Sequence, residues 1–140
     1  MDCFLCRKHA GETAQPPGGY IYEDEYWLVC HAPAEKSLLG TLIIESRRHF
    51  LDFADAEEDE LVRYGPLLKN VYRALKSLIG AARVYQVVFV EGAPHFHAWL
   101  VPRASEETAR GVSLLTRDAA CSQAEAEKLA DALRSALATT

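Results

Sequence analysis

The stretch that decides the fold is Pro94-His95-Phe96-His97-Ala98-Trp99-Leu100-Val101-Pro102-Arg103. Its histidines stand two positions apart and are separated and followed by apolar residues. Successive side chains of a β-strand point to opposite faces, so the pattern predicts a strand with His95, His97 and Trp99 on one face. Imidazoles held in this way can bind a metal, attack an electrophile or transfer a proton. The stretch therefore indicates a functional strand.

The composition is that of a globular protein large enough for one domain. The 140 residues are 49% hydrophobic and 25% charged, with a formal net charge of −5. The acidic balance and the lack of a basic run argue against a nucleic-acid partner. No apolar run reaches the ~18 residues of a membrane span, and no signal peptide is apparent. We therefore expect a cytoplasmic protein whose four cysteines are metal ligands or buried thiols.

The order of expected elements predicts one α+β domain over residues 1–140. Glycines and prolines mark residues 1–19 as an irregular segment. We expect a mainly antiparallel sheet. Its strands are a hairpin over 20–23 and 26–30, a strand over 41–45, and paired strands over 84–90 and 95–101. A long helix is expected after the His49 strand, with Asp55 and Glu58 as a capping box, a kink or local fraying at Pro66 and an end at Gly80. A C-terminal helix is expected over 122–138.

A second pattern lies at the start of the chain, in Cys3-Phe4-Leu5-Cys6. A C-x2-C pair suits zinc because a tight turn can direct two thiolates at one ion. A structural zinc site has four ligands, so two more must come from elsewhere. Spacing alone does not choose among the candidate nitrogen ligands, which are His9, His31, His49 and His95.

Together these patterns resemble the histidine triad (HIT) superfamily of nucleotide hydrolases and transferases. The resemblance covers nearly the whole chain: the C-x2-C opening, the segment from Gly40 to His49 with its apolar strand and Arg-Arg-His, the following helix, and the His95 strand with its Pro-Arg ending. It implies the HIT-like fold, a nucleotide or dinucleoside polyphosphate as substrate, and a homodimer formed through the strand and long helix of each subunit.

The resemblance also implies roles for single residues. The second motif histidine, His97, would attack the α-phosphate and form a covalent nucleotidyl-histidine intermediate. Cys3, Cys6, His49 and His95 would hold a structural zinc. His31, Gly92, Trp99 and Arg103 would lie in the substrate-binding region, where Arg103, Arg47 or Arg48 could offset phosphate charge.

The sequence departs from the family pattern at three places. Trp99 replaces the third motif histidine, and its indole offers one N–H donor and a large apolar surface. His31 stands where the family commonly has an aspartate that binds the ribose. Glu91-Gly92-Ala93-Pro94 lacks the serine that contacts phosphate in many members.

Two functions follow from these observations. The first is a nucleotide hydrolase or nucleotidyl transferase that acts through His97. The second is a HIT-fold nucleotide-binding or regulatory protein with weak or no catalysis, because Trp99 and His31 replace polar contacts.

Overall fold

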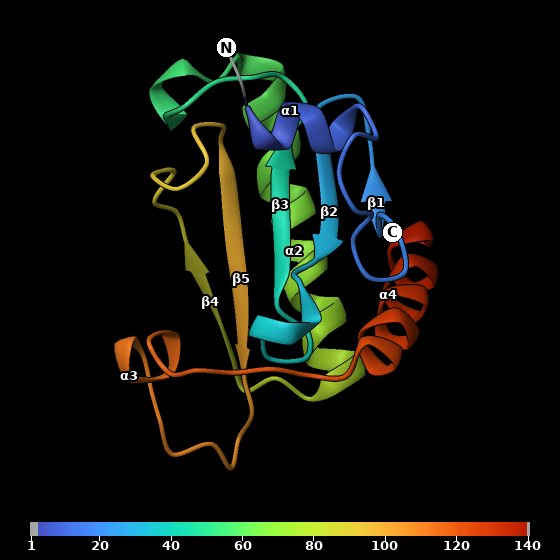
Figure 1. Ribbon diagram of the computed structural model, residues 1–140, viewed down its shortest axis with the longest axis vertical. Helices are drawn as coiled ribbons and strands as arrows, with labels where there is room; N and C mark the ends of the chain where they lie inside the picture. The colour runs from blue at the N-terminus through green and yellow to red at the C-terminus, as the bar shows by residue number, and fades with distance from the viewer. Residues whose placement is uncertain (1–2, 140) are drawn as a thin grey trace.

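The computed structural model describes residues 3–139 and has the expected α+β architecture (Figure 1). Five strands form one antiparallel sheet in the order β1-β2-β3-β5-β4. Their bounds are Tyr22–Glu23 (β1), Trp27–His31 (β2), Leu42–Ser46 (β3), Arg83–Val87 (β4) and His97–Arg103 (β5). The helices are Phe4–His9 (α1), Glu58–Ile79 (α2), Val112–Leu115 (α3) and Gln123–Ala138 (α4), with 3₁₀ turns at Ala34–Lys36 (η1) and Phe53–Asp55 (η2).

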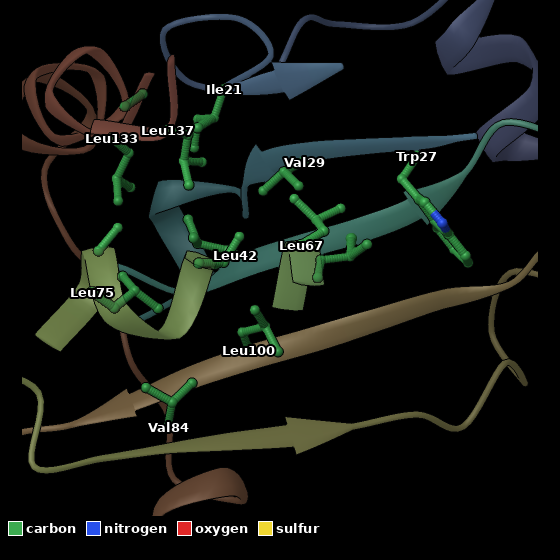
Figure 2. Packing of buried hydrophobic residues seen from close by; sticks show 14 of the residues in the cluster. Ile21, Trp27, Val29, Leu42, Leu67, Leu75, Val84, Leu100, Leu133 and Leu137 are labelled. Carbon is green, nitrogen blue, oxygen red and sulfur yellow. The ribbon is translucent and has the colours of Figure 1, made fainter. Parts of the chain in front are cut away.

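One face of the sheet carries the hydrophobic core. Alternate residues of the strands point to this face, as the period of two requires. In Figure 2 they meet apolar residues of α2 and α4, which cover the face. The core residues labelled there are Ile21, Trp27, Val29, Leu42, Leu67, Leu75, Val84, Leu100, Leu133 and Leu137. Helix α2 runs behind the sheet in Figure 1 and α4 lies beside β1, so the opposite face is left for the N-terminal segment and for function.

The long helix α2 begins and ends through recognisable caps. Glu57 and Glu60 form a reciprocal capping box at its start, whereas the box at Asp52 and Asp55 caps the preceding turn η2. Gly80 ends the helix with φ of 64°, the left-handed conformation expected at this position. Of the kink or local fraying predicted at Pro66, the fraying does not occur, because the helix is continuous through that position. The rest of its backbone ladder and the packing of its buried face hold the helix together across that position.

Three of the differences from the sequence-based expectation have a clear local cause. Residues 4–9 form helix α1 inside the segment expected to be irregular, because the Cys3 side chain accepts a hydrogen bond from the Cys6 N–H and caps its first turn. Strand β4 stops at Val87, and Val90 has a positive φ of 55° that interrupts the extended chain. Strand β5 begins at His97, because the backbone at His95 closes a tight turn onto Ala93.

The C-terminal helix α4 matches its prediction closely. Ser122 is the N-cap and its hydroxyl accepts a hydrogen bond from the Glu125 N–H. Within residues 3–139 no helix is long and apolar enough to cross a membrane.

Candidate metal centre and the His97 cavity

Four side chains from distant parts of the chain converge at one end of the sheet. Cys3 and Cys6 come from the first turn of α1, which lies across the ends of β2 and β3 in Figure 1. His49 follows β3, and His95 lies two residues before the start of β5. One ligand atom from each residue lies within 4.8 Å of every other. The fold therefore brings together the four residues that the sequence resemblance assigned to a metal.

The spacing of these atoms suits a tetrahedral cation. His95 Nδ1 lies 3.2 Å from His49 Nδ1, 3.5 Å from Cys3 Sγ and 3.6 Å from Cys6 Sγ. Cys6 Sγ lies 3.5 Å from His49 Nδ1. In a tetrahedron with Zn–N of about 2.0–2.1 Å and Zn–S of about 2.3 Å, N–N edges measure about 3.3–3.4 Å and N–S edges about 3.5–3.6 Å. The donor set and its spacing both fit zinc.

The protonation of His95 is also suited to metal binding. Its Nε2 lies 2.7 Å from the Ser46 carbonyl oxygen and must donate a proton to it, which leaves the Nδ1 lone pair facing the cluster. Burial lowers the pKa of His95, so the ring is neutral at pH 7. The two remaining nitrogen candidates are engaged elsewhere, since His9 bonds Glu45 and His31 bonds the backbone.

His97 is held differently, with one nitrogen fixed and the other unoccupied. Its Nδ1 lies 2.8 Å from the His95 carbonyl oxygen and donates to it, so Nε2 carries the lone pair. The strand register places His97 opposite Glu45 of β3. Among residues 3–139, no side chain occupies His97 Nε2. The ring is therefore oriented as a nucleophile, a base or a ligand.

A cavity of about 530 Å³ adjoins His97 on the face of the sheet opposite the core. Its walls are largely apolar, with a few polar groups, as in many small-molecule sites. The cavity is lined by residues of α1, the segment Thr13–Pro17, the loop after β2, β3 and β5. Among the lining residues are Leu5, Pro16, His31, Ile43, His97 and Trp99. The Thr13–Pro17 wall could not be predicted from the sequence, because an irregular segment carries no periodic signal.

Trp99 forms part of the cavity wall instead of joining the main core. Its side chain is half-buried and packs against the small cluster of Cys30, Ala32 and Ile43. The centres of the Trp99 and His97 rings are 6.5 Å apart at an interplanar angle of 66°. We find no hydrogen bond from the indole N–H to any of residues 3–139. The indole therefore forms a wall of the cavity beside His97.

His31 lines the cavity but has no free ring nitrogen. Its Nδ1 donates to the Ala32 carbonyl oxygen at 2.7 Å, and its Nε2 accepts from the Gly40 N–H at 3.0 Å. Burial lowers the pKa of His31, which is 1% exposed, so the ring is neutral. Gly40 has φ of +90°, and a Cβ there would lie 2.5 Å from Ile79. The imidazole therefore joins the two ends of the loop from 31 to 40, and only its carbon edge can reach a ligand.

Of the loop before His95, Ala93 lines the cavity and Gly92 does not. Gly92 is exposed in the same turn. A Cβ added at Gly92 would meet no atom within 4 Å among the described residues beyond its chain neighbours. A contact from Gly92 would require the loop to approach the substrate.

The three arginines considered for phosphate binding lie away from the cavity. Arg47 bonds Glu23 and the Asp24 carbonyl, and Arg48 bonds Glu60 and the Asp55 carbonyl. Arg103 lies at the far end of β5, about 20 Å from His97 at ~3.3 Å per residue. Lys36 of η1 is instead the exposed cation that lines the cavity, and no spacing rule pointed to it.

A buried polar network supports the cavity floor and was also missed from the sequence. Glu45 is 0% exposed and accepts hydrogen bonds from Lys8 Nζ at 2.7 Å, His9 Nε2 at 2.8 Å and Tyr20 Oη at 2.9 Å. Burial alone would raise the pKa of Glu45, but these hydrogen bonds and the Lys8 charge lower it to about 2. The network joins α1 to β3 directly beneath the His97 side of the sheet.

The comparisons with known proteins bear on this fold. No protein-family model and no curated protein sequence matches the chain. Solved structures do match. A zinc-bound histidine triad family protein from Mycobacterium smegmatis superimposes with a TM-score of 0.75 at 20% identity, covering 99% of this chain and 95% of the other. The fold is that of the histidine triad proteins.

Two further histidine triad structures agree over nearly the same length. A hypothetical histidine triad nucleotide-binding protein from Sulfolobus tokodaii has a TM-score of 0.74 at 19% identity and covers 98% of this chain and 93% of its own. A Hit-like protein involved in cell-cycle regulation from Bartonella henselae has a TM-score of 0.74 at 15% identity, with 96% of each chain covered. At these identities the likeness establishes the histidine triad fold of the chain.

Proposed function

We propose that this protein is a zinc-containing member of the HIT superfamily that hydrolyses or transfers a nucleotidyl group through His97. The observation that carries the proposal is the orientation of His97, whose Nδ1 donates to the His95 carbonyl and whose Nε2 is unoccupied beside a 530 Å³ cavity. A neutral imidazole with a fixed donor nitrogen is a competent nucleophile near pH 7.

The proposed reaction has two displacements at phosphorus. His97 Nε2 forms a bond to the α-phosphorus of a nucleoside phosphoryl substrate while the bond from phosphorus to the leaving group breaks. Water or another acceptor then attacks the nucleotidyl-His97 intermediate, and the P–N bond breaks to regenerate the imidazole. Lys36 is the cation placed to offset phosphate charge, and the Trp99 N–H is a candidate donor to a phosphate oxygen.

The metal has a structural role in this proposal. The residues that would hold zinc are Cys3, Cys6, His49 and His95. Four protein ligands would leave no position for a catalytic water, as in structural zinc sites. The ion would hold α1 against the turn before β5. The Mycobacterium smegmatis protein of the same fold is zinc-bound, which supports zinc as the metal.

We also propose that the protein is a cytoplasmic homodimer. Strand β4 is at the edge of the sheet, and the residues after it include the exposed Val88 and Phe89. Helix α2 adds exposed Leu61, Val62 and Leu78. Edge strands with apolar neighbours favour pairing with a second chain. All four cysteines are free thiols, which suits a reducing compartment.

The experiment that tests the proposed chemistry is covalent trapping. Protein is mixed with nucleoside phosphoramidates and dinucleoside polyphosphates that carry a label on the α-phosphate, then quenched and digested. We expect label on the peptide that contains His97 and none in His97→Ala, with the metal content and fold of the variant unchanged. Turnover that survives in His97→Ala would overturn the mechanism.

The alternative is a HIT-fold nucleotide-binding or regulatory protein with weak or no catalysis. It is favoured by His31, whose ring nitrogens are both occupied, and by Trp99 in place of the third histidine. Nucleotide binding by calorimetry without label on His97 would select this alternative.

A further inference from the structure

Arg103, at the end of β5, is a buried cation without a carboxylate partner among the described residues. It is 6% exposed, and within residues 3–139 its guanidinium makes one hydrogen bond, from Nη1 to the Ala104 carbonyl oxygen at 3.3 Å. Its Nε–H is buried and has no acceptor in the same part of the chain. Buried charges are normally paired, and Glu45 and Glu60 in this protein both are. The guanidinium is therefore an exception that requires an explanation.

A pocket of about 260 Å³ adjoins Arg103 and is separate from the His97 cavity. Its walls are mainly aliphatic: Leu38, Leu39, Ile79, Ala81, Pro102 and Leu114. Ala104 also lines the pocket and is exposed, so one side reaches the protein surface. For comparison, an apolar cavity of about 150 Å³ in another protein accommodates benzene. The pocket has room for a compact organic molecule.

Glu107 is the acidic residue in the pocket wall, and it is already engaged. Its Oε1 accepts from Arg117 Nη2 at 2.6 Å and its Oε2 accepts from the Ala109 N–H at 3.0 Å. No ion pair joins it to Arg103 within the part of the chain that the structure describes. Glu107 and Arg117 neutralise each other, so the pocket keeps the single positive charge of Arg103.

We propose that this pocket binds a small organic monocarboxylate whose apolar body fills the aliphatic wall and whose carboxylate accepts from Arg103. The planar guanidinium matches a carboxylate, and charge-assisted hydrogen bonds of this kind are strong. One guanidinium balances one negative charge. A dianion such as a phosphate monoester would place a second, unbalanced charge against the aliphatic wall. The site lies about 20 Å along β5 from His97, so it is distinct from the proposed nucleotide site.

Calorimetry and thermal unfolding with benzoate and hexanoate test this proposal on the zinc-loaded full chain. We expect saturable binding of at least one acid, and an increase in Tm of about 3–6 °C at roughly ten times its Kd. Benzyl alcohol, which keeps the ring and removes the charge, should bind at least about ten-fold more weakly.

Arg103→Met removes the charge and keeps an apolar side chain of similar length. This variant should fold, because it removes an unpaired buried cation, and its affinity for the acid should fall by about ten-fold or more. Arg83→Met is the matched control, since Arg83 lies directly opposite Arg103 in the strand register but is exposed. It should bind the acid as the wild type does.

Three results would overturn the proposal. The first is no binding of either acid at about 10 mM, a concentration that detects even Kd values in the millimolar range. The second is equal affinity of Arg103→Met and the wild type. The third is tighter binding of inorganic phosphate than of either acid. None of these results depends on labelling or turnover at His97, so the two proposals fail separately.

Discussion

At the scale of single residues, the chemistry depends on how each histidine is restrained. His95, His97 and His31 each use one ring nitrogen to donate to a backbone carbonyl, which fixes their tautomers. Only the second nitrogen then differs: that of His95 faces the cluster, that of His97 faces the cavity, and that of His31 accepts from Gly40. Three identical side chains therefore acquire three different environments from their backbone partners.

The lowered pKa of Glu45 predicts that the folded protein loses stability at low pH. Its pKa falls from an ordinary value of 4.5 to about 2 in the folded protein, so the unfolded chain binds the proton first as the pH falls. The stabilisation by Glu45 is complete above about pH 4.5 and is lost as the pH falls towards 2. Urea unfolding of the wild type and Glu45→Gln from pH 7 to 3 measures this.

Glu45→Gln should cost about 3–5 kcal/mol at pH 7, because it leaves Lys8 buried without its partner. The difference between the two proteins should narrow below about pH 4.5, and loss of a bound metal affects both proteins alike. A difference that stays constant down to pH 3 would contradict the low pKa of Glu45.

Trp99→His tests whether the missing third histidine limits the rate. A new hydrogen bond to phosphate in a desolvated site would be worth about 1.5–3 kcal/mol, or roughly ten- to a hundred-fold in kcat/KM. Because Trp99 is only half-buried, the cost of the cavity left by the indole should be below the ~3–5 kcal/mol of a fully buried Trp.

Trp99→Phe is the matched control for this experiment, since it keeps an aromatic wall and removes the N–H donor. Activity is measured beside Tm for both variants. If Trp99→His folds normally and is no faster than the wild type, the third position does not limit the reaction.

At the scale of elements, α1 and the turn before β5 are joined through the Cys3, Cys6, His49 and His95 cluster. Cys6→Ser should therefore abolish stoichiometric zinc and lower the Tm, because metal binding contributes directly to folding free energy. Cys121→Ser is the control, since this cysteine lies outside the cluster. Elemental analysis and thermal unfolding with and without chelator measure both effects. Wild-type protein that contains no zinc and keeps full stability in chelator would exclude the metal site.

The same element boundaries show what the sequence could and could not predict. The α2 and α4 periodicities, Gly80 and the Ser122 cap are local signals, and they predicted both helices. The alternation of residues 97–101 likewise predicted β5. Helix α1 was missed because six residues carry too short a period, and its cap is a cysteine thiol instead of a usual capping group. The start of β5 was misplaced because His95 lies in a tight turn onto Ala93 and the Phe96 N–H donates to the distant Phe50 carbonyl, and neither bond has a local sequence signal.

In the candidate site too, residues within sequence motifs could be predicted and those placed by tertiary packing could not. Residues of the motifs could be assigned by resemblance, and the fold does bring Cys3, Cys6, His49 and His95 together. The surroundings could not be inferred. Lys36, the Thr13–Pro17 wall and the Lys8–Glu45 pair come from segments distant in sequence, and only tertiary packing places them beside β3 and β5. Arg103 belongs to the motif stretch in sequence but lies at the end of β5 opposite His97.

At the scale of the whole molecule, the free edge of the sheet predicts an assembly. Phe89 is 77% exposed beside the β4 edge, which suits contact with a second chain. We expect the wild type to sediment as a dimer at micromolar concentration, and Phe89→Glu to weaken the dimer by at least about ten-fold through burial of a charge. Leu51→Glu, at another exposed apolar residue, should leave the dimer unchanged. A monomeric wild type at these concentrations would contradict the proposal.

His95 connects the metal cluster to His97. Its ring contributes Nδ1 to the cluster, and its carbonyl oxygen holds the imidazole of His97. Metal binding at the cluster and the orientation of the His97 imidazole therefore both depend on His95. Thermodynamic reciprocity then requires that, if zinc tightens nucleotide binding by some factor, the nucleotide tightens zinc binding by the same factor at equilibrium. Zinc scarcity would then reduce nucleotide affinity in protein that is still folded, and abundant nucleotide would protect the metal.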